Sequence, residues 1–161
     1  MTERPILFNG LMVHAILEGR KTQTRRVVKL PKIAVGDRLW VREAFYFQRW
    51  LGKPLAQPQP IHYAVDTRPD DVEDYALSPS IHMPRWASRI TLEIVGVRVQ
   101  RVRDISETDA EAEGITPQPS GKFPAQKAFG YLWDSLNKPG RRWADNPLVW
   151  VLTFKRVEVR P

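Results

Sequence analysis

The feature that most constrains the fold is one long alternating segment, residues 89–102. Apolar residues recur at every second position from Ile90 to Ile94 and then, one position out of phase, from Val95 onward, with Gly96 beside the change. A period of two is that of a β-strand, and a glycine inside such a pattern marks a bulge or a bend. The segment therefore predicts a long strand with a bulge at which its buried face changes, as is common in small barrels.

The other predicted elements are short and do not alternate in the order of a parallel α/β protein. Apolar or alternating segments predict strands at 35–45, 61–66 and 146–159, and helical periodicity predicts helices at 9–18, 106–114 and 125–137. Residues 47–60 are rich in proline and predict an exposed loop, while residues 67–88 have no clear period and predict an irregular excursion. We expect a single α+β domain over residues 1–161, a small mixed or antiparallel β-barrel flanked by short helices, with an irregular insertion at about 47–88.

The first predicted helix, residues 9–18, follows Asn9, which is a suitable N-cap. Leu11, Ala15 and Ile16 fall on one face of this helix and are expected to be buried. The helix leads directly into the most basic segment of the chain.

The chain carries a surplus of positive charge. It has 161 residues, with 25 Lys and Arg against 18 Asp and Glu, a net charge of +7 that favours anionic partners such as nucleic acids. There is no cysteine and no close spacing of the three histidines, so we expect no metal and no cofactor. Neither a signal peptide nor an apolar run of ~18 residues is present, so we expect a cytoplasmic protein without a membrane partner.

Residues 19–26, GRKTQTRR, contain four cations and two hydroxyls without an acid. The segment is a phosphate-binding patch, a solvated loop, or a site at which a lysine acts on a hydroxyl. In a tight turn the side chains of Lys21 and Thr24 converge, and the neighbouring arginines would lower the pKa of Lys21 toward that of a base. Charge alone favours the solvated loop, because charge runs are usually solvated.

The second candidate segment is the predicted helix at 106–114, with Ser106 as N-cap and Gly114 as its stop. Glu111 and Glu113 are two positions apart and so face different ways. Glu113 lies at the negative end of the helix, which disfavours a carboxylate, and a carboxyl group that keeps its proton can act as a general acid. Most acids on short helices are simply solvated, and the helix alone favours that interpretation.

The third candidate is the strand at 35–45, on which Trp40 and Arg42 share a face. Flat aromatic rings such as Trp40 and Trp86 stack on nucleobases, and Arg42 or Glu43 can read a base edge by hydrogen bonding. A tryptophan in a strand pattern is equally expected in the hydrophobic core.

Four segments together resemble the ASCH domain family of the PUA-like superfamily, in its longer bacterial and phage-encoded form. They are GRKTQTRR at 19–26, GDRLWVRE at 36–43, MPRWASRITLE at 83–93 and NPLVWV at 146–151. The resemblance covers almost the whole chain and implies a PUA-like β-barrel. Family members are viewed as RNA-binding modules, some are reported to cleave RNA, and others are transcription coactivators.

One small bacterial branch of that family consists of N4-acetylcytidine amidohydrolases, with a lysine and a threonine in GRKTxTxR and a glutamate in AExE. These positions fall on Lys21, Thr24 and Glu113 here. The resemblance implies removal of the acyl group from an N4-acylated cytidine or a related modified nucleoside. Either Lys21 takes the proton of Thr24, which attacks the acyl carbon while Glu113 protonates the amine, or Lys21 and Glu113 activate water and Thr24 orients the substrate.

The small amidohydrolases lack the segment between Phe47 and Ser88 and do not share the WVRE residues, which makes Glu43 an alternative to Glu113 as the acid. The preferred acyl group is left open by these differences. The residues expected to bind the substrate are Arg20, Arg26, Trp40, Arg42, Glu43 and Trp86. The alternative function is an RNA-binding ASCH module, with or without ribonuclease activity, whose partner is RNA rather than a modified nucleoside.

Overall fold

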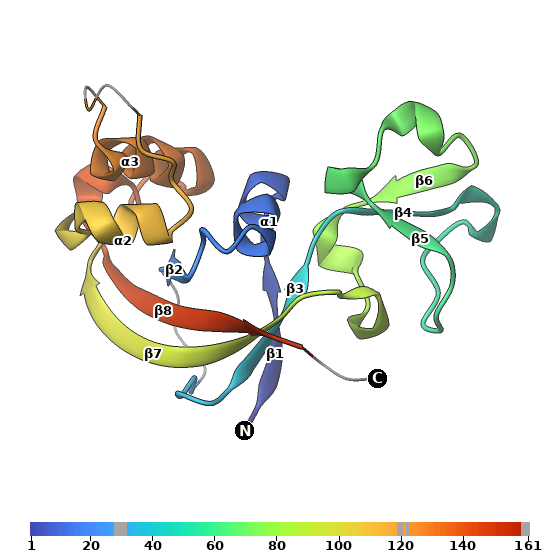
Figure 1. Cartoon of the computed structure of the whole chain (residues 1–161), viewed down its shortest axis with the longest axis horizontal. Coiled ribbons are helices and arrows are strands. Elements are labelled where there is room, and N and C mark those ends of the chain that lie inside the picture. The colour runs from blue at the N-terminus through green and yellow to red at the C-terminus, as the bar shows by residue number, and fades with distance from the viewer. Residues whose placement is uncertain (28–31, 119–120, 122, 159–161) are drawn as a thin grey trace. The chain divides into compact units, whose positions relative to one another are not determined.

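The computed structural model describes residues 1–27, 32–118, 121 and 123–158. Its helices are α1 (Gly10–Leu17), α2 (Glu107–Ala112) and α3 (Ala125–Leu136), and its strands are β1 (Glu3–Leu7), β2 (Gln23–Arg26), β3 (Arg38–Arg42), β4 (Phe45–Gln48), β5 (Ile61–Tyr63), β6 (Tyr75–Ser78), β7 (Thr91–Arg101) and β8 (Leu148–Val157) (Figure 1). Short 3-10 helices lie at Arg49–Leu51, Ala64–Asp66, Pro69–Asp71, Ser80–His82, Arg85–Ala87, Val102–Asp104 and Trp143–Asp145. The predicted α+β class is confirmed.

The strands form one mixed sheet and one antiparallel sheet. The larger sheet has the order β1-β3-β7-β8-β2, in which β1 is parallel to β3 while β3 and β7, and β2 and β8, are antiparallel. The smaller sheet has the order β5-β4-β6, with both pairs antiparallel. The expected combination of parallel and antiparallel pairing is therefore present.

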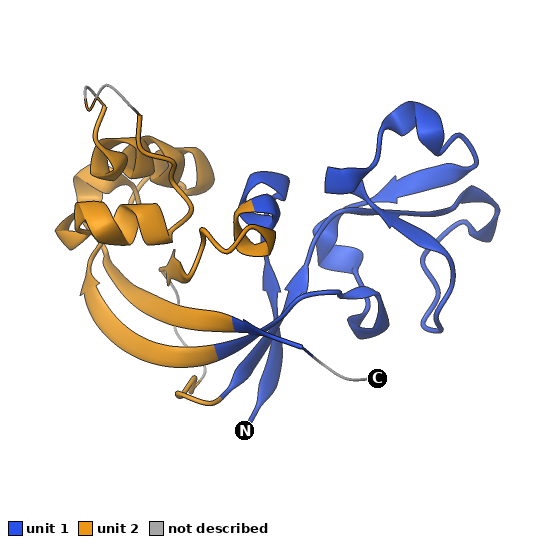
Figure 2. Cartoon of the chain, in the orientation of Figure 1, with its two compact units in different colours: residues 1–14, 37–93, 156–161 blue, residues 15–36, 94–155 orange. Residues whose placement is uncertain are grey.

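The chain divides into two compact units, each built from segments that are separated in the sequence (Figure 2). Unit 1 consists of residues 1–14, 37–93 and 156–161, and unit 2 consists of residues 15–36 and 94–155. The strands β1 and β3 to β6 belong to unit 1, whereas β2, α2 and α3 belong to unit 2.

Unit 1 has a core under its three-stranded sheet. The buried members are Phe45, Phe47, Met83 and Ala87, and the partly buried residues packed against them are Leu51, Ile61, Tyr63, Ala76 and Trp86. One strand of this sheet, β6, lies inside residues 67–88, where an irregular excursion was expected. At four residues, β6 is too short to show a period in the sequence, and its pairing with β4 defines it as a strand.

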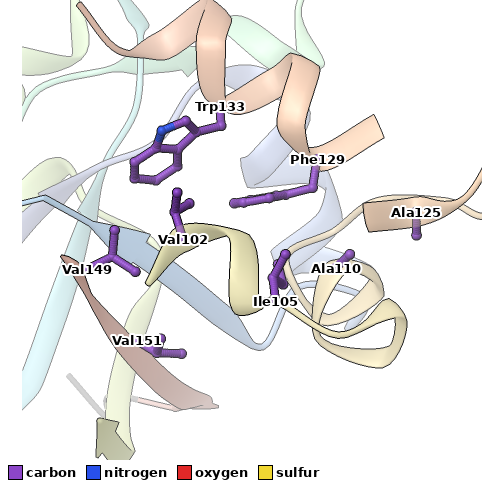
Figure 3. Close-up of a cluster of buried hydrophobic side chains, with 8 residues drawn as sticks. All are labelled: Val102, Ile105, Ala110, Ala125, Phe129, Trp133, Val149 and Val151. Carbon is purple, nitrogen blue, oxygen red and sulfur yellow. The ribbon is translucent and has the colours of Figure 1, made fainter. Parts of the chain in front are cut away.

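Unit 2 has its core between the helices α2 and α3 and the strand β8 (Figure 3). The buried members are Val102, Ile105, Ala110, Ala125, Phe129, Trp133, Val149 and Val151. Phe129 and Trp133 are four positions apart on α3, so both side chains point from one face of that helix into the cluster. The indole N–H of Trp133 donates to the carbonyl of Arg141 at 2.8 Å, which satisfies its polar atom. This core supports the helices that carry part of the candidate site.

The first helix begins as predicted, because the Asn9 side chain accepts a hydrogen bond from the backbone N–H of Met12 at 2.9 Å. The expected burial of Ala15 and Ile16 is confirmed. Leu11, however, is 80% exposed, and Val13 is buried instead. An eight-residue helix gives little periodic signal, so its buried face could not be fixed within one position.

The long strand β7 runs without interruption from Thr91 to Arg101. The apolar residues on either side of Gly96 do not form a new buried face, since Val95 and Val99 are 43% and 50% exposed. A Cβ atom at Gly96 would lie 3.4 Å from the Cβ of Thr153 on β8. Gly96 thus marks a close approach of two neighbouring strands, rather than the predicted change of buried face.

Candidate active site

The basic segment is an extended strand with two buried cations. Gln23–Arg26 forms β2 and pairs with β8, and Lys21 makes an isolated antiparallel bridge with Glu113. The side chains of Lys21 and Arg25 are 0% exposed. The solvated-loop interpretation, which charge alone favoured, is therefore wrong for these two residues.

The ammonium group of Lys21 donates to three oxygen atoms. Nζ lies 2.7 Å from the carbonyl of Gln23, 2.9 Å from the carbonyl of Glu113 and 3.0 Å from Glu113 Oε2. A protonated lysine has three N–H donors, so these acceptors match its full capacity. The bridge thus brings together two of the three residues that the motifs pair, across 92 positions of sequence.

Burial lowers the pKa of Lys21 below its ordinary value, because the charged ammonium loses water. The carboxylate of Glu113 acts in the opposite direction and favours the ammonium form, while Arg26 and Arg25 add smaller contributions that lower the pKa. The expected direction of the shift is present. Its main cause is desolvation and not the cationic neighbours to which the sequence pattern attributed it.

The carboxylate of Glu113 is held by a cation at each oxygen. Oε2 accepts from Lys21 at 3.0 Å, and Oε1 accepts from Nη1 of Arg25 at 2.8 Å. The side chain is 4% exposed. Gly114, which follows, has a φ angle of +101°, and a Cβ atom there would lie 3.0 Å from the Cβ of Ala15. The chain therefore turns directly after Glu113 in a way that only glycine accommodates without strain.

The helix α2 presents Glu113 as predicted. The Ser106 hydroxyl accepts from the backbone N–H of Asp109 at 3.0 Å and caps the first turn. Glu111 is exposed on this helix whereas Glu113 is buried, in agreement with their spacing of two. The segment thus supplies one buried carboxylate, and not a pair.

Arg25 and Asp109 belong to the same buried network and were not identified as site residues from the sequence. Nη2 of Arg25 lies 3.2 Å from Asp109 Oδ2, and the Gln23 side chain donates to Asp109 Oδ1 at 3.1 Å. Two spacings were available as signals. Lys21, Gln23 and Arg25 are two apart along an extended segment, and Asp109 and Glu113 are one helical turn apart.

Thr24 lies in the same strand and is buried, with 3% of its surface exposed. Successive side chains of a strand point to opposite sides, so Thr24 points away from the side taken by Gln23 and Arg25. Within the described residues, no hydrogen bond joins its hydroxyl to Lys21 or Glu113. The extended backbone thus replaces the tight turn in which Lys21 and Thr24 were expected to converge.

The other two arginines of the basic segment differ in exposure: Arg20 precedes β2 and is exposed, whereas Arg26, the last residue of β2, is partly buried. The side chain of Arg20 is 40% exposed, and it donates to Glu18 Oε2 at 2.7 Å and to the carbonyl of Gly114 at 3.0 Å. Burial lowers the pKa of Arg26, and the charge of Glu113 opposes this shift. Arg26 is therefore electrostatically coupled to the candidate pair, whereas Arg20 ties the turn after α2 to the start of the basic segment.

The remaining expected binding residues belong to unit 1, where they have partners of their own. Both oxygens of Glu43 accept from the guanidinium of Arg89, at 3.0 and 2.8 Å. Trp40 is 8% exposed, and the guanidinium carbons of Arg42 and Arg85 lie 4.8 and 5.7 Å from its ring centroid. Trp40 therefore matches the core alternative, and Glu43 forms a bidentate ion pair.

Trp86, the last of the expected binding residues, is half-buried against the core of unit 1. Its indole N–H donates to the carbonyl of Leu55 at 3.2 Å. The ring thus packs on one side and is anchored by its polar atom.

Two general properties of the described residues bear on the chemistry. Within them, no group of three or more His, Asp or Glu side chains is placed to hold a metal ion. No helix in this part of the chain is long and apolar enough to cross a membrane.

Comparison with known proteins gives a structural similarity. No protein-family profile and no curated protein matches the sequence. An ASCH domain structure from Lactobacillus crispatus JV V101 aligns over 96% of this chain and 79% of its own, with 15% identity and a TM-score of 0.49. Protein EF3133 from Enterococcus faecalis V583, of family DUF984, aligns over 96% of this chain and 76% of its own, with 13% identity and a TM-score of 0.51.

The chain shares the fold of EF3133. The EF3133 fold extends over both units, since the alignment covers nearly the whole chain. At 13% identity the similarity is one of architecture. The similarity therefore shows the fold and not the chemistry of the site.

Proposed function

We propose that the protein is an amidohydrolase that removes the acyl group from N4-acylated cytidine or a related modified nucleoside. The observation that carries this proposal is the buried contact of 3.0 Å between Lys21 Nζ and Glu113 Oε2. The two residues are 92 positions apart, and two separate sequence motifs single them out. Buried titratable groups that shift one another's protonation are a common property of catalytic sites.

The contacts favour a charged pair, because each partner lies within hydrogen-bonding distance of an opposite charge. In the proposed reaction Glu113 takes a proton from water, and the water oxygen forms a bond to the acyl carbon. Lys21 then protonates the amine nitrogen as the bond between carbon and nitrogen breaks. A proton passes from Glu113 to Lys21 along their hydrogen bond, which restores the pair and leaves free amine and carboxylic acid.

The lowered pKa of Lys21 suits this role, because an ammonium group destabilised by burial gives up its proton more readily than an exposed one. This assignment makes Glu113 the base and Lys21 the acid. It corresponds to the water-activation alternative without the role for Thr24, whose side chain points away from the side of β2 on which Arg25 contacts Glu113. Arg26, which is coupled to Glu113, would stabilise the negative charge that develops on the acyl oxygen.

The test is hydrolysis of N4-acetylcytidine, followed as release of cytidine. We expect Glu113→Gln and Lys21→Met to reduce kcat/KM by on the order of 10²- to 10⁴-fold. Glu111→Gln is the matched control, since Glu111 is exposed on the same helix. Circular dichroism checks that each variant is folded. Near-normal turnover by folded Glu113→Gln and Lys21→Met would contradict the proposal.

A further inference from the structure

The guanidinium of Arg25 joins the Glu113 carboxylate to a second acid. Nη1 donates to Glu113 Oε1 at 2.8 Å and to Gln23 Oε1 at 3.2 Å, while Nη2 lies 3.2 Å from Asp109 Oδ2. With the Gln100 amide oriented so that its oxygen faces this group, that oxygen accepts from Nε at 3.3 Å and from Nη2 at 2.9 Å. Every nitrogen of the guanidinium thus has an acceptor, which fixes the plane of the group.

Asp109, the second acid, accepts hydrogen bonds from three side chains. Its Oδ1 accepts from the Gln23 side chain at 3.1 Å, and its Oδ2 accepts from Arg25 at 3.2 Å and from Arg98 at 2.6 Å. Glu113, the C-cap of α2, is four positions after Asp109 and keeps helical backbone angles, so the two side chains lie on one face, one turn from each other. The planar fork of Arg25 matches this spacing, since its two terminal nitrogens contact one carboxylate each.

Exposure separates the two ends of the network. The side chain of Arg25 is 0% exposed, that of Glu113 is 4%, and that of Asp109 is 23%. A buried cation requires a nearby negative charge, and Arg25 has two. If Asp109 lost its charge, Glu113 would be the only carboxylate left to Arg25 among these contacts. The guanidinium would then lose one of the acceptors that fix its plane, and Oε1 of Glu113 would lose its fixed donor.

We infer that Asp109 and Arg25 are positioning residues, in which Asp109 fixes the guanidinium of Arg25 and Arg25 fixes the carboxylate of Glu113. The consequence for catalysis rests on the proposed deacylation, in which Glu113 takes the proton of the attacking water. Proton transfer and attack depend on a carboxylate held in one direction, and a displacement of about 1 Å costs on the order of 10²-fold in rate. Neither residue takes or gives a proton in this scheme, and Arg25 acts through the Glu113 carboxylate that it contacts.

The closing experiment combines a spectroscopic and a kinetic readout on the full chain. Nuclear magnetic resonance of the arginine side chains shows whether the Arg25 guanidinium is held, because a fixed group gives separate signals for its Nη protons and a rotating one gives averaged signals. We expect separate signals in the wild type and in Glu111→Gln, and averaged signals in Asp109→Asn. Separate, unshifted signals in Asp109→Asn would overturn the inference.

The kinetic part uses N4-acetylcytidine. We expect Asp109→Asn to lower kcat on the order of 10²-fold with KM within about twofold, and Glu111→Gln to change neither. Arg25→Lys is the second variant. This variant keeps the positive charge, but a single ammonium group cannot contact both carboxylates as the two terminal nitrogens of the guanidinium do, so we expect the same loss of kcat. Unchanged kcat in both folded variants would overturn the catalytic consequence. An inactive wild type would instead contradict the proposed function, and the resonance signals would still decide whether Asp109 positions Arg25.

Discussion

At the scale of single residues, the cost of burying charge dominates the candidate site. Lys21, Arg25 and Glu113 have almost no exposed side-chain surface. Removal of one partner from a buried ion pair is more harmful than removal of both, because the remaining charge has neither water nor a counter-charge. The negative charge of Glu113 compensates the buried charges of Lys21 and Arg25, so it is important for folding as well as for the proposed reaction.

Glu113→Gln is therefore expected to lower the free energy of unfolding by about 3 to 5 kcal/mol. The glutamine still accepts a hydrogen bond from Arg25, but it removes the carboxylate that contacts Lys21. The double variant Lys21→Met with Glu113→Gln also removes the ammonium that contacted Glu113 and should recover at least half of the loss. Urea unfolding followed by tryptophan fluorescence measures both. A double variant no more stable than Glu113→Gln would show that the ammonium is not the source of the cost.

Tyr63 in unit 1 has a shifted pKa, and the variant Tyr63→Phe isolates its effect on stability. Burial raises the pKa of Tyr63, and the nearby Glu43 and Asp66 carboxylates add to this shift, while the positive charge of Arg89 opposes it. The guanidinium carbon of Arg89 lies 3.9 Å from the ring centroid, and the hydroxyl donates to the carbonyl of Ala87 at 2.9 Å. The folded protein therefore keeps the phenol proton to higher pH than the unfolded chain does.

The sign of the pH effect follows from this difference in proton binding. Above the ordinary value of 10.0, the unfolded state binds fewer protons at Tyr63 than the folded state, so stability falls as pH rises. The stability that Tyr63 contributes through its raised pKa is fully present below pH 10.0 and is lost as the pH rises through the pKa of the folded state. We expect the difference in unfolding free energy between wild type and Tyr63→Phe to be flat below about pH 10 and to shrink above it. A constant difference throughout would contradict the raised pKa.

At the scale of elements, the two helices of unit 2 depend on one another. The N-cap of α3, Pro124, offers no side-chain hydrogen bond. Both oxygens of Glu107, from the first turn of α2, instead accept from the backbone N–H groups of Ala125 and Gln126 at 2.9 and 3.1 Å. A carboxylate at this position satisfies two free donors and complements the positive end of the α3 dipole.

Glu107→Ala should therefore lower stability by about 1 to 2 kcal/mol, the usual cost of a lost helix cap. Glu111→Ala changes an exposed glutamate of the same helix and should stay within about 0.5 kcal/mol of the wild type. Thermal unfolding of the two variants compares them directly. Equal losses would mean that the effect comes from α2 itself and not from the contact with α3.

The elements were predictable where the signal is local. The strand around Trp40, the Asn9 and Ser106 caps and the stop at Gly114 all depend on neighbouring residues, and the structure shows each of them, although Leu39, Trp40 and Val41 are all buried and do not alternate. By contrast, β6 owes its existence to pairing with β4, which a four-residue segment does not reveal.

The candidate site divides in the same way. The contact of Lys21 with Glu113 was expected from two motifs. The burial of Arg25 was not expected, because its acidic partners lie 84 and 88 positions away and the local sequence contains no acid. A buried cation is recognisable only when its counter-charges are known, and the fold supplies these.

At the scale of the whole molecule, the net charge of +7 makes the response to salt the property that distinguishes the proposed function from RNA binding. Contacts between cations and phosphates release counterions, so the affinity for a polymer falls steeply with salt. In unit 2, Lys21 and Arg25 are already paired with Glu113, and Arg98 is paired with Asp109. Carboxylates within the protein balance the charge of these cations, so they are less available to bind a polyanion.

We therefore expect kcat/KM for N4-acetylcytidine to change by less than about twofold between about 50 and 200 mM salt, because that nucleoside carries no charge for salt to screen. A single-stranded RNA of mixed sequence is the comparison. If RNA binding were the main function, the logarithm of its affinity would fall with the logarithm of the salt concentration at a slope of roughly −0.7 for each phosphate contacted. Tight RNA binding with such a slope, together with no nucleoside turnover, would contradict the proposed deacylation and favour the RNA-binding alternative. Turnover that is insensitive to salt, and is lost in Glu113→Gln, would place the chemistry at the buried pair rather than on the charged surface.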